Sequence, residues 1–128
     1  MIRFGILCLV LLVSLTFSLP TCNVSYWVNP QNKDCSTPPN GTYSGLNYNG
    51  NCTLTPDEPT EATYLLVINP ENKIVQNFTV YDNLNCKNTD ITFIVKTPIP
   101  LDSCAILYFQ STSTSFDEVG TLVFSCKE

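Results

Sequence analysis

Six cysteines after residue 20 are the residues whose chemistry is most informative in this sequence: Cys22, Cys35, Cys52, Cys86, Cys104 and Cys126. A seventh, Cys8, lies in an N-terminal segment that we expect to be removed. A zinc site is disfavoured because the chain contains no histidine and no C-x-x-C pair. An even number of cysteines in a short chain, in an oxidising compartment, predicts three disulfides.

Sequence alone does not choose among the possible pairings of these cysteines. The spacing favours Cys35–Cys52 and Cys86–Cys104 as two local loops, with Cys22–Cys126 joining the two ends of the domain. Two similar turn sequences, VNPQNK at 28–33 and INPENK at 68–73, point in the same direction. Together they raise the hypothesis of an internal duplication with one disulfide in each half.

The residue types that are missing exclude several kinds of chemistry. Without histidine there is no Ser-His-Asp or Cys-His nucleophile system and no His-ligated metal. The only arginine is Arg3, and the acidic side chains outnumber the basic ones by 11 to 6. This balance argues against nucleic acid and against anionic lipid surfaces as partners. We therefore expect no catalytic residues, no metal and no cofactor.

Two groups of acidic and amide side chains need a specific explanation. Carboxylates at 57–61 and 117–118 could pair as the acid and nucleophile of a glycosidase, but they lie in polar loops where carboxylates are usually solvated. The turn at 82–90 is rich in oxygen donors that suit calcium. Its spacing does not match an EF-hand, because Leu84 and Cys86 stand at ligand positions, so ordinary turn chemistry is the favoured interpretation.

Four aromatic residues could form a binding surface for a sugar or a protein partner: Tyr26, Trp27, Tyr43 and Tyr48. The alternative, which we favour, is that Trp27 belongs to the core and the tyrosines cover loops. Four N-x-S/T sequons are also present, at Asn23, Asn40, Asn51 and Asn77.

Asn77 is the sequon with the clearest structural setting. Strand alternation over 74–81 places Ile74, Phe78 and Val80 on one face and the residues at 75, 77, 79 and 81 on the other. A glycan requires water, so the face of Asn77 should be the outer one. The apolar face of this strand is then expected to point inward.

The ends of the chain predict a secreted protein. Residues 1–18 have the basic start, the short apolar run and the small residues Thr16 and Ser18 of a signal peptide. Residues 19–128 should form a single domain, and the C-terminus TLVFSCKE has no features of a lipid-anchor signal. We expect an extracellular protein without a stable membrane anchor.

The segments that contain the residues discussed above have the sequence patterns of short strands. Strand-like runs occur at 21–28, 63–68, 74–81, 91–95, 105–109 and 119–124, and no stretch has helical periodicity. The sequence of residues 42–52 predicts an irregular loop or weak hairpin. The pattern predicts a small all-β fold, a disulfide-stapled antiparallel β-sandwich, with an irregular β-barrel as the alternative. Two strands are apolar on both faces, so we expect a loop or a second chain to cover the outer face.

These features favour a secreted, N-glycosylated, non-enzymatic binding protein that recognises an extracellular protein or glycan. The alternative is a small secreted defence effector. A protease inhibitor would present a rigid loop, for which TPIPLDSC at 97–104 is the nearest candidate. A membrane-active toxin is normally cationic, whereas this chain has a formal net charge of −5. The sequence does not specify an oligomeric state.

Overall fold

The computed structural model describes residues 19–28, 34–56 and 61–127, and this part of the chain is almost entirely β-structure. The predicted signal peptide at 1–18 lies outside the described residues. The strands are β1 (Thr21–Trp27), β2 (Gly41–Leu46), β3 (Thr53–Leu54), β4 (Thr63–Asn69), β5 (Ile74–Tyr81), β6 (Ile91–Val95), β7 (Ile99–Pro100), β8 (Ala105–Gln110) and β9 (Phe116–Lys127). One 3-10 turn, Asn88–Asp90, precedes β6.

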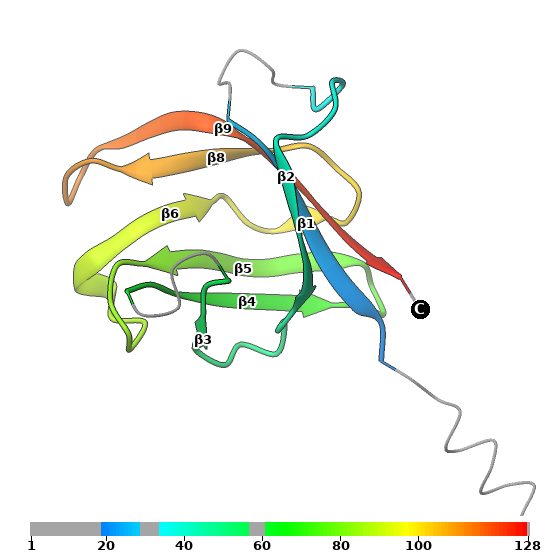
Figure 1. The fold of residues 1–128 in the computed structure, drawn as a ribbon, viewed down its shortest axis with the longest axis horizontal. Coiled ribbons are helices and arrows are strands. Elements are labelled where there is room, and N and C mark those ends of the chain that lie inside the picture. The colour runs from blue at the N-terminus through cyan, green and yellow to red at the C-terminus, as the bar shows by residue number, and fades with distance from the viewer. Residues whose placement is uncertain (1–18, 29–33, 57–60, 128) are drawn as a thin grey trace, which may run out of the picture.

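The strands form one nine-stranded antiparallel sheet with the order β2-β1-β9-β8-β6-β5-β4-β3, and β7 pairs with β5. The sheet curls into a half-barrel, so that β1 and β2 cross over β4 and β5 (Figure 1). Its two ends face each other as the sheets of a sandwich do, while its strand pairing is continuous as in a barrel. The predicted small all-β, antiparallel, disulfide-stapled fold is therefore confirmed.

Residues 42–52, predicted as an irregular loop or a weak hairpin, connect the two ends of the curled sheet. Residues 41–46 form β2, and the following segment then pairs with β4. Ile68 N donates to Tyr48 O at 3.0 Å, and Gly50 N donates to Leu66 O at 3.0 Å. The sequence did not reveal these pairings because the segment is rich in Gly and Asn, which do not show the alternation of a strand.

The predicted hairpin at 63–81 is confirmed, but the assignment of faces in β5 was partly wrong. Val67 pairs with Asn77 whereas Ile68 pairs with Val75, so Gln76 is an extra residue in β5. This β-bulge shifts the alternation by one position. Val75, expected to face outward, therefore faces the core together with Phe78 and is fully buried.

The core occupies one end of the curled sheet. Phe124 from β9 is 1% exposed, and its ring meets that of Phe78 edge-on, with centroids 5.1 Å apart. Leu66 and Val75 are fully buried beside them. These side chains come from strands far apart in the sequence, so the core joins the two ends of the sheet.

Two of the three predicted disulfide pairings were wrong. The bonds are Cys22–Cys126, as predicted, Cys35–Cys104 and Cys52–Cys86. The last two connect the halves of the chain that the local pairings treated as separate modules, so the prediction of two modules with one disulfide each is also wrong. The local pairings fail because the sheet order, not the sequence spacing, decides which cysteines meet. Cys104 directly precedes β8, whose pairing with β9 brings it near the segment after β1.

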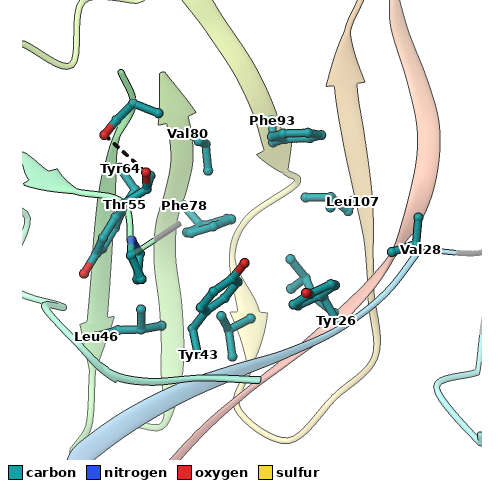
Figure 2. A pocket seen from close by; sticks show the side chains of 14 residues that line it. Tyr26, Val28, Tyr43, Leu46, Thr55, Tyr64, Phe78, Val80, Phe93 and Leu107 are labelled. Atoms are coloured by element: carbon teal, nitrogen blue, oxygen red, sulfur yellow. Dashed lines mark hydrogen bonds between the residues drawn. The ribbon is translucent and has the colours of Figure 1, made fainter. Parts of the chain in front are cut away.

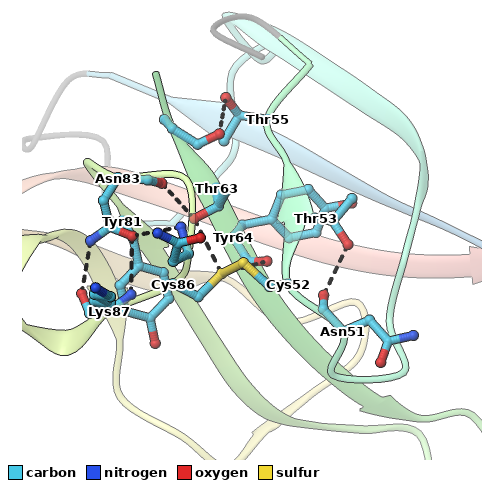
Figure 3. Close-up of a disulfide and its surroundings, with 12 residues drawn as sticks. Asn51, Cys52, Thr53, Thr55, Thr63, Tyr64, Tyr81, Asn83, Cys86 and Lys87 are labelled. Atoms are coloured by element: carbon cyan, nitrogen blue, oxygen red, sulfur yellow. Dashed lines mark hydrogen bonds between the residues drawn. A yellow bond between two sulfur atoms is a disulfide. The ribbon is translucent and has the colours of Figure 1, made fainter. Parts of the chain in front are cut away.

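The Cys52–Cys86 disulfide fastens the turn between β5 and β6 onto the outer face of β4 (Figure 3). Cys86 Sγ lies 3.1 Å from Thr63 Oγ1, and Thr63 Oγ1 donates to Asn83 O at 2.8 Å. Thr63 and Tyr81 are buried beneath this turn. The outer face of β4 was expected to be covered by the N-terminal loop region or a second chain, whereas here the turn between β5 and β6 covers it. This cover explains why Tyr81, predicted to face water, is buried.

Gly120 marks the closest approach between β9 and the end of β1. A Cβ atom added at Gly120 would collide with the carbonyl oxygen of Trp27, which is backbone and cannot move aside. We expect Gly120→Ala to lower the free energy of unfolding by about 1–3 kcal/mol, the usual cost of overpacking. Chemical denaturation followed by Trp27 fluorescence measures this. A loss no greater than that of Ser44→Ala, an exposed change in β2, would contradict the close approach.

Candidate functional site

The concave side of the sheet holds a cavity of about 420 Å³ at the end that the core leaves unfilled (Figure 2). Its walls come from seven of the strands, β1, β2, β4, β5, β6, β8 and β9, and from the segment around Thr55. The lining residues are Val24, Tyr26, Val28, Tyr43, Leu46, Thr55, Pro56, Ala62, Tyr64, Phe78, Val80, Phe93, Leu107 and Leu122. The volume falls within the range of roughly 300–1,000 Å³ typical of small-molecule sites.

Strand alternation and one bulge bring these side chains to the same side. In β1, Val24 and Tyr26 point inward at every second position. In β2, Tyr43 and Leu46 are three positions apart and would normally face opposite ways. Gly45 has a positive φ of 69° and sits in a bulge against β1, which turns both side chains into the cavity. The cavity therefore depends on a backbone feature that alternation does not reveal.

The four aromatic residues considered for a binding surface do not all lie at one site. Tyr26 and Tyr43 stack with centroids 5.4 Å apart and line the cavity. Trp27 points to the convex side, is buried, and its Nε1 donates to Thr37 O at 2.7 Å. Tyr48 packs against the core, and its hydroxyl donates to Pro20 O at 3.1 Å. Only the Tyr26–Tyr43 pair therefore belongs to the candidate site.

The sequence reasoning missed most of the cavity wall. Phe78 and Val80 were identified as inward-facing, but Phe93 and Leu107 were not considered for a site. A signal was present, because these residues occupy the inward positions of β6 and β8. What the pattern lacked was any sign that inward-facing residues at this end would surround a cavity rather than fill a core.

Among the described residues, the lining is mostly apolar: it has four hydroxyls, those of Tyr26, Tyr43, Thr55 and Tyr64, and no charged side chain. The Tyr64 hydroxyl accepts a hydrogen bond from Asn47 N at 3.0 Å, and the Thr55 hydroxyl donates to Ala62 O at 3.3 Å. These two hydroxyls are therefore engaged with the protein itself. The arrangement has no acid, base or nucleophile positioned for chemistry, and it suits the burial of apolar surface.

Apolar side chains continue from the cavity to the surface. Val28 lines the cavity and is 59% exposed. Phe109 is 36% exposed, and its ring lies 5.7 Å from that of Phe93, which lines the cavity. Residues of this type at a rim keep the entrance apolar. A strand carboxylate, Asp117, lies opposite Phe109 at this rim.

The turn at 82–90 uses its oxygens within the turn. Asn83 Oδ1 accepts from the backbone N of both Asn85 and Lys87, each at 3.0 Å. The Tyr81 hydroxyl donates to Asn88 Oδ1 at 3.4 Å. Among the described residues, no three His, Cys, Asp or Glu side chains gather as a metal site. The turn thus has the side-chain-to-backbone bonds of ordinary turn chemistry.

The carboxylates considered for glycosidase chemistry do not converge in the described part of the chain. Asp57 and Glu58 lie outside the described residues. Glu61 is exposed. Asp117 and Glu118 are exposed neighbours in β9, where consecutive side chains point to opposite faces. This pair does not have the facing geometry that glycoside hydrolysis requires.

Two of the four sequons lie on the convex side of the sheet. Asn23 and Asn77 alternate with Val24 and Phe78, which line the cavity. Asn40 and Asn51 are exposed in the segments that precede β2 and β3.

The hydrogen bonds of three sequons fit with glycosylation. Asn23, Asn40 and Asn77 each accept a hydrogen bond through Oδ1, from Gly45 N, Val28 N and Thr79 Oγ1 respectively. A glycan is carried by the amide nitrogen, so these bonds would persist in a glycosylated chain.

The loop at 97–104, considered for protease inhibition, is tied into the sheet. Ile99 and Pro100 form β7 and pair with β5. Leu101 packs against the core, and Asp102 N donates to Phe124 O at 2.7 Å. An inhibitory loop presents its side chains to a protease, whereas the apolar side chains here are used in packing.

Comparisons with known proteins give no match for this chain. No protein-family model, no curated protein and no solved structure resembles it to a significant degree. None of the described residues forms a helix long and apolar enough to cross a membrane. The function therefore has to be argued from the site itself.

Proposed function

We propose that this chain is a secreted, N-glycosylated, non-enzymatic binding protein that holds an extracellular partner in the cavity on the concave side of its sheet. The observation that carries the proposal is the cavity of about 420 Å³, whose wall is mostly apolar and, among the described residues, contains no charged side chain. Such a site can bind without reacting, because it positions no acid, base or nucleophile.

Three disulfides indicate an oxidising, extracellular environment. They also support binding, because they fix the sheet around the cavity. Cys22–Cys126 joins β1 to β9, and Cys52–Cys86 holds the turn after β5 against β4. A site with rigid walls loses less conformational entropy on binding.

A comparison of two lysine variants tests the proposal. Leu107 lines the cavity, whereas its neighbour Ile106 points to the opposite face of β8. The purified protein is screened against glycan arrays, cell surfaces and a panel of apolar small molecules. We expect a saturable ligand whose affinity falls about tenfold or more in Leu107→Lys and about twofold or less in Ile106→Lys.

Three results would contradict this function. A ligand bound equally well by both variants would lie outside the cavity. Chemical turnover of the bound ligand would make the protein an enzyme. Saturable inhibition of one protease in a parallel panel, without any ligand in the screen, would favour a defence effector instead.

Gly41 offers a second, gentler way to alter the cavity. A Cβ added at Gly41 would lie 2.5 Å from the Tyr26 hydroxyl oxygen, because the Tyr26 ring covers this glycine. Gly41→Ala should push the ring into the cavity and weaken ligand binding about three- to tenfold, with a small cost in stability. A binding isotherm for the ligand found above measures this. Unchanged affinity in a folded Gly41→Ala protein would show that Tyr26 does not contact the ligand.

A further inference from the structure

We infer that the ligand of the cavity is an uncharged, chain-like or ring-bearing apolar small molecule with at most one or two polar groups. The inference rests on the proposed function and specifies its ligand. It departs from the protein or glycan partner that the sequence favoured, because the geometry of the wall does not suit either one.

The size of the cavity sets the size of the ligand. A volume of about 420 Å³ accommodates roughly 14 non-hydrogen atoms, if each takes the roughly 30 Å³ that one water molecule occupies in the liquid. This matches a chain of ten to twelve carbons or a fused two-ring compound. A protein partner could insert only one or two side chains.

The absence of charge from the wall sets the charge of the ligand. Among the described residues, none of those that line the cavity is Asp, Glu, Lys or Arg. An ionised group moved into such a wall loses its hydration and gains no partner there, which weakens its binding. At the rim the nearest strand carboxylate is Asp117, opposite Phe109. A fatty-acid carboxylate would therefore find no counter-ion inside and a like charge at the rim.

The few polar groups of the wall argue against a glycan. Sugars carry many hydroxyls, and each one must keep a hydrogen bond when it leaves water. The described wall has four hydroxyls, those of Tyr26, Tyr43, Thr55 and Tyr64, which are too few for a sugar, and those of Tyr64 and Thr55 are already bonded within the protein. Tyr26 and Tyr43 place two stacked rings on one side of the cavity, facing Phe78 and Phe93 on the other (Figure 2). This wall favours hydrocarbon and aromatic surface.

The rim provides a route for such a ligand. Val28 and Phe109 are exposed at the end of the cavity where Phe93 and Leu107 line it. An apolar molecule reaching this rim keeps contact with apolar side chains as it enters. Exposed aromatic and aliphatic residues at one place on a soluble domain commonly mark a binding site.

A matched pair of ligands tests the ligand class. N-phenyl-1-naphthylamine, a neutral dye that fluoresces in apolar sites, serves as the reporter, with its two fused rings in the cavity and its phenyl ring at the apolar rim. 1-Decanol and decanoate compete with it at pH 7.5. We expect 1-decanol to displace the dye from the full secreted protein at a concentration about tenfold or more below that of decanoate. Leu107→Lys should reverse this order, because its ammonium group pairs with the carboxylate, while Ile106→Lys should not.

The outcomes separate this inference from the proposed function. Displacement by decanoate at an equal or lower concentration in the unmodified protein overturns the uncharged class and leaves the cavity as a binding site. If neither chain displaces the dye, yet Leu107→Lys still abolishes binding in the wider screen, the ligand class is wrong and the function stands. If dye and ligands bind equally to both lysine variants, both proposals fail. Should Leu107→Lys not fold, Gly41→Ala replaces it, with weaker binding of 1-decanol as the expected result.

Discussion

Removing the Cys22–Cys126 disulfide by the double change Cys22→Ala and Cys126→Ala should lower the free energy of unfolding by about 4–5 kcal/mol. The two cysteines are 104 residues apart in sequence and stand directly opposite each other in β1 and β9. The bond therefore closes nearly the whole domain into one loop, and loop closure restricts the unfolded chain more as the loop grows. Denaturant unfolding followed by Trp27 fluorescence measures the loss.

The Cys52–Cys86 disulfide supplies the matched control. Its sequence separation is 34, so the same loop-closure relation predicts a loss of about 3.8 kcal/mol, roughly 1 kcal/mol less. The order of the two losses is the informative result. A larger loss from removing Cys52–Cys86 would show that its role in fastening the turn over Thr63 outweighs chain entropy. Peptide mapping under non-reducing conditions should recover all three pairs, and a Cys86–Cys104 peptide would contradict the structure.

Phe124→Ala should lower the free energy of unfolding by about 3–5 kcal/mol. Phe124 is 1% exposed and meets Phe78 edge-on at 5.1 Å, so truncation removes apolar contacts and leaves a space that the sheet fills only in part. This space would adjoin the natural cavity, because Phe78 also lines it. Chemical denaturation gives the loss, and dye binding to the variant reports whether the cavity has grown.

Phe116→Ala is the control for this change. Phe116 lies in the same strand, β9, but is 44% exposed. Its truncation should cost about 1 kcal/mol or less. Similar losses for the two variants would mean that the core is not centred on Phe124, and would call for another account of how the two ends of the sheet are held together.

Local chemistry made several features predictable. The hairpin of two strands, predicted at 63–68 and 74–81, was found because the first run is rich in Tyr, Val and Ile, the second alternates, and an Asn-Pro turn lies between them. Each of these signals lies within a few residues. The Cys22–Cys126 pairing was found because it joins the two ends of the domain. The six cysteines and the absence of histidine likewise restricted the possible chemistry without any knowledge of the fold.

Two β-bulges explain why strand alternation did not show which side chains face the core and the cavity. Gln76 and Gly45 each shift the strand alternation by one position, which sends Val75 to the core and brings both Tyr43 and Leu46 into the cavity. A bulge depends on how the neighbouring strand is paired, so the sequence of one strand does not reveal it.

By itself, the sequence determined that this is a small antiparallel β protein with three disulfides and no histidine chemistry, since composition and local patterns carry that information. Only the tertiary structure decided that Cys35 meets Cys104, that Trp27 is covered on the convex side, and that Tyr26 and Tyr43 stack in a cavity with Phe93 and Leu107. The physical reason is the curl of the sheet. Contacts between strands remote in sequence arise from sheet order and curvature, which depend on all the strands together.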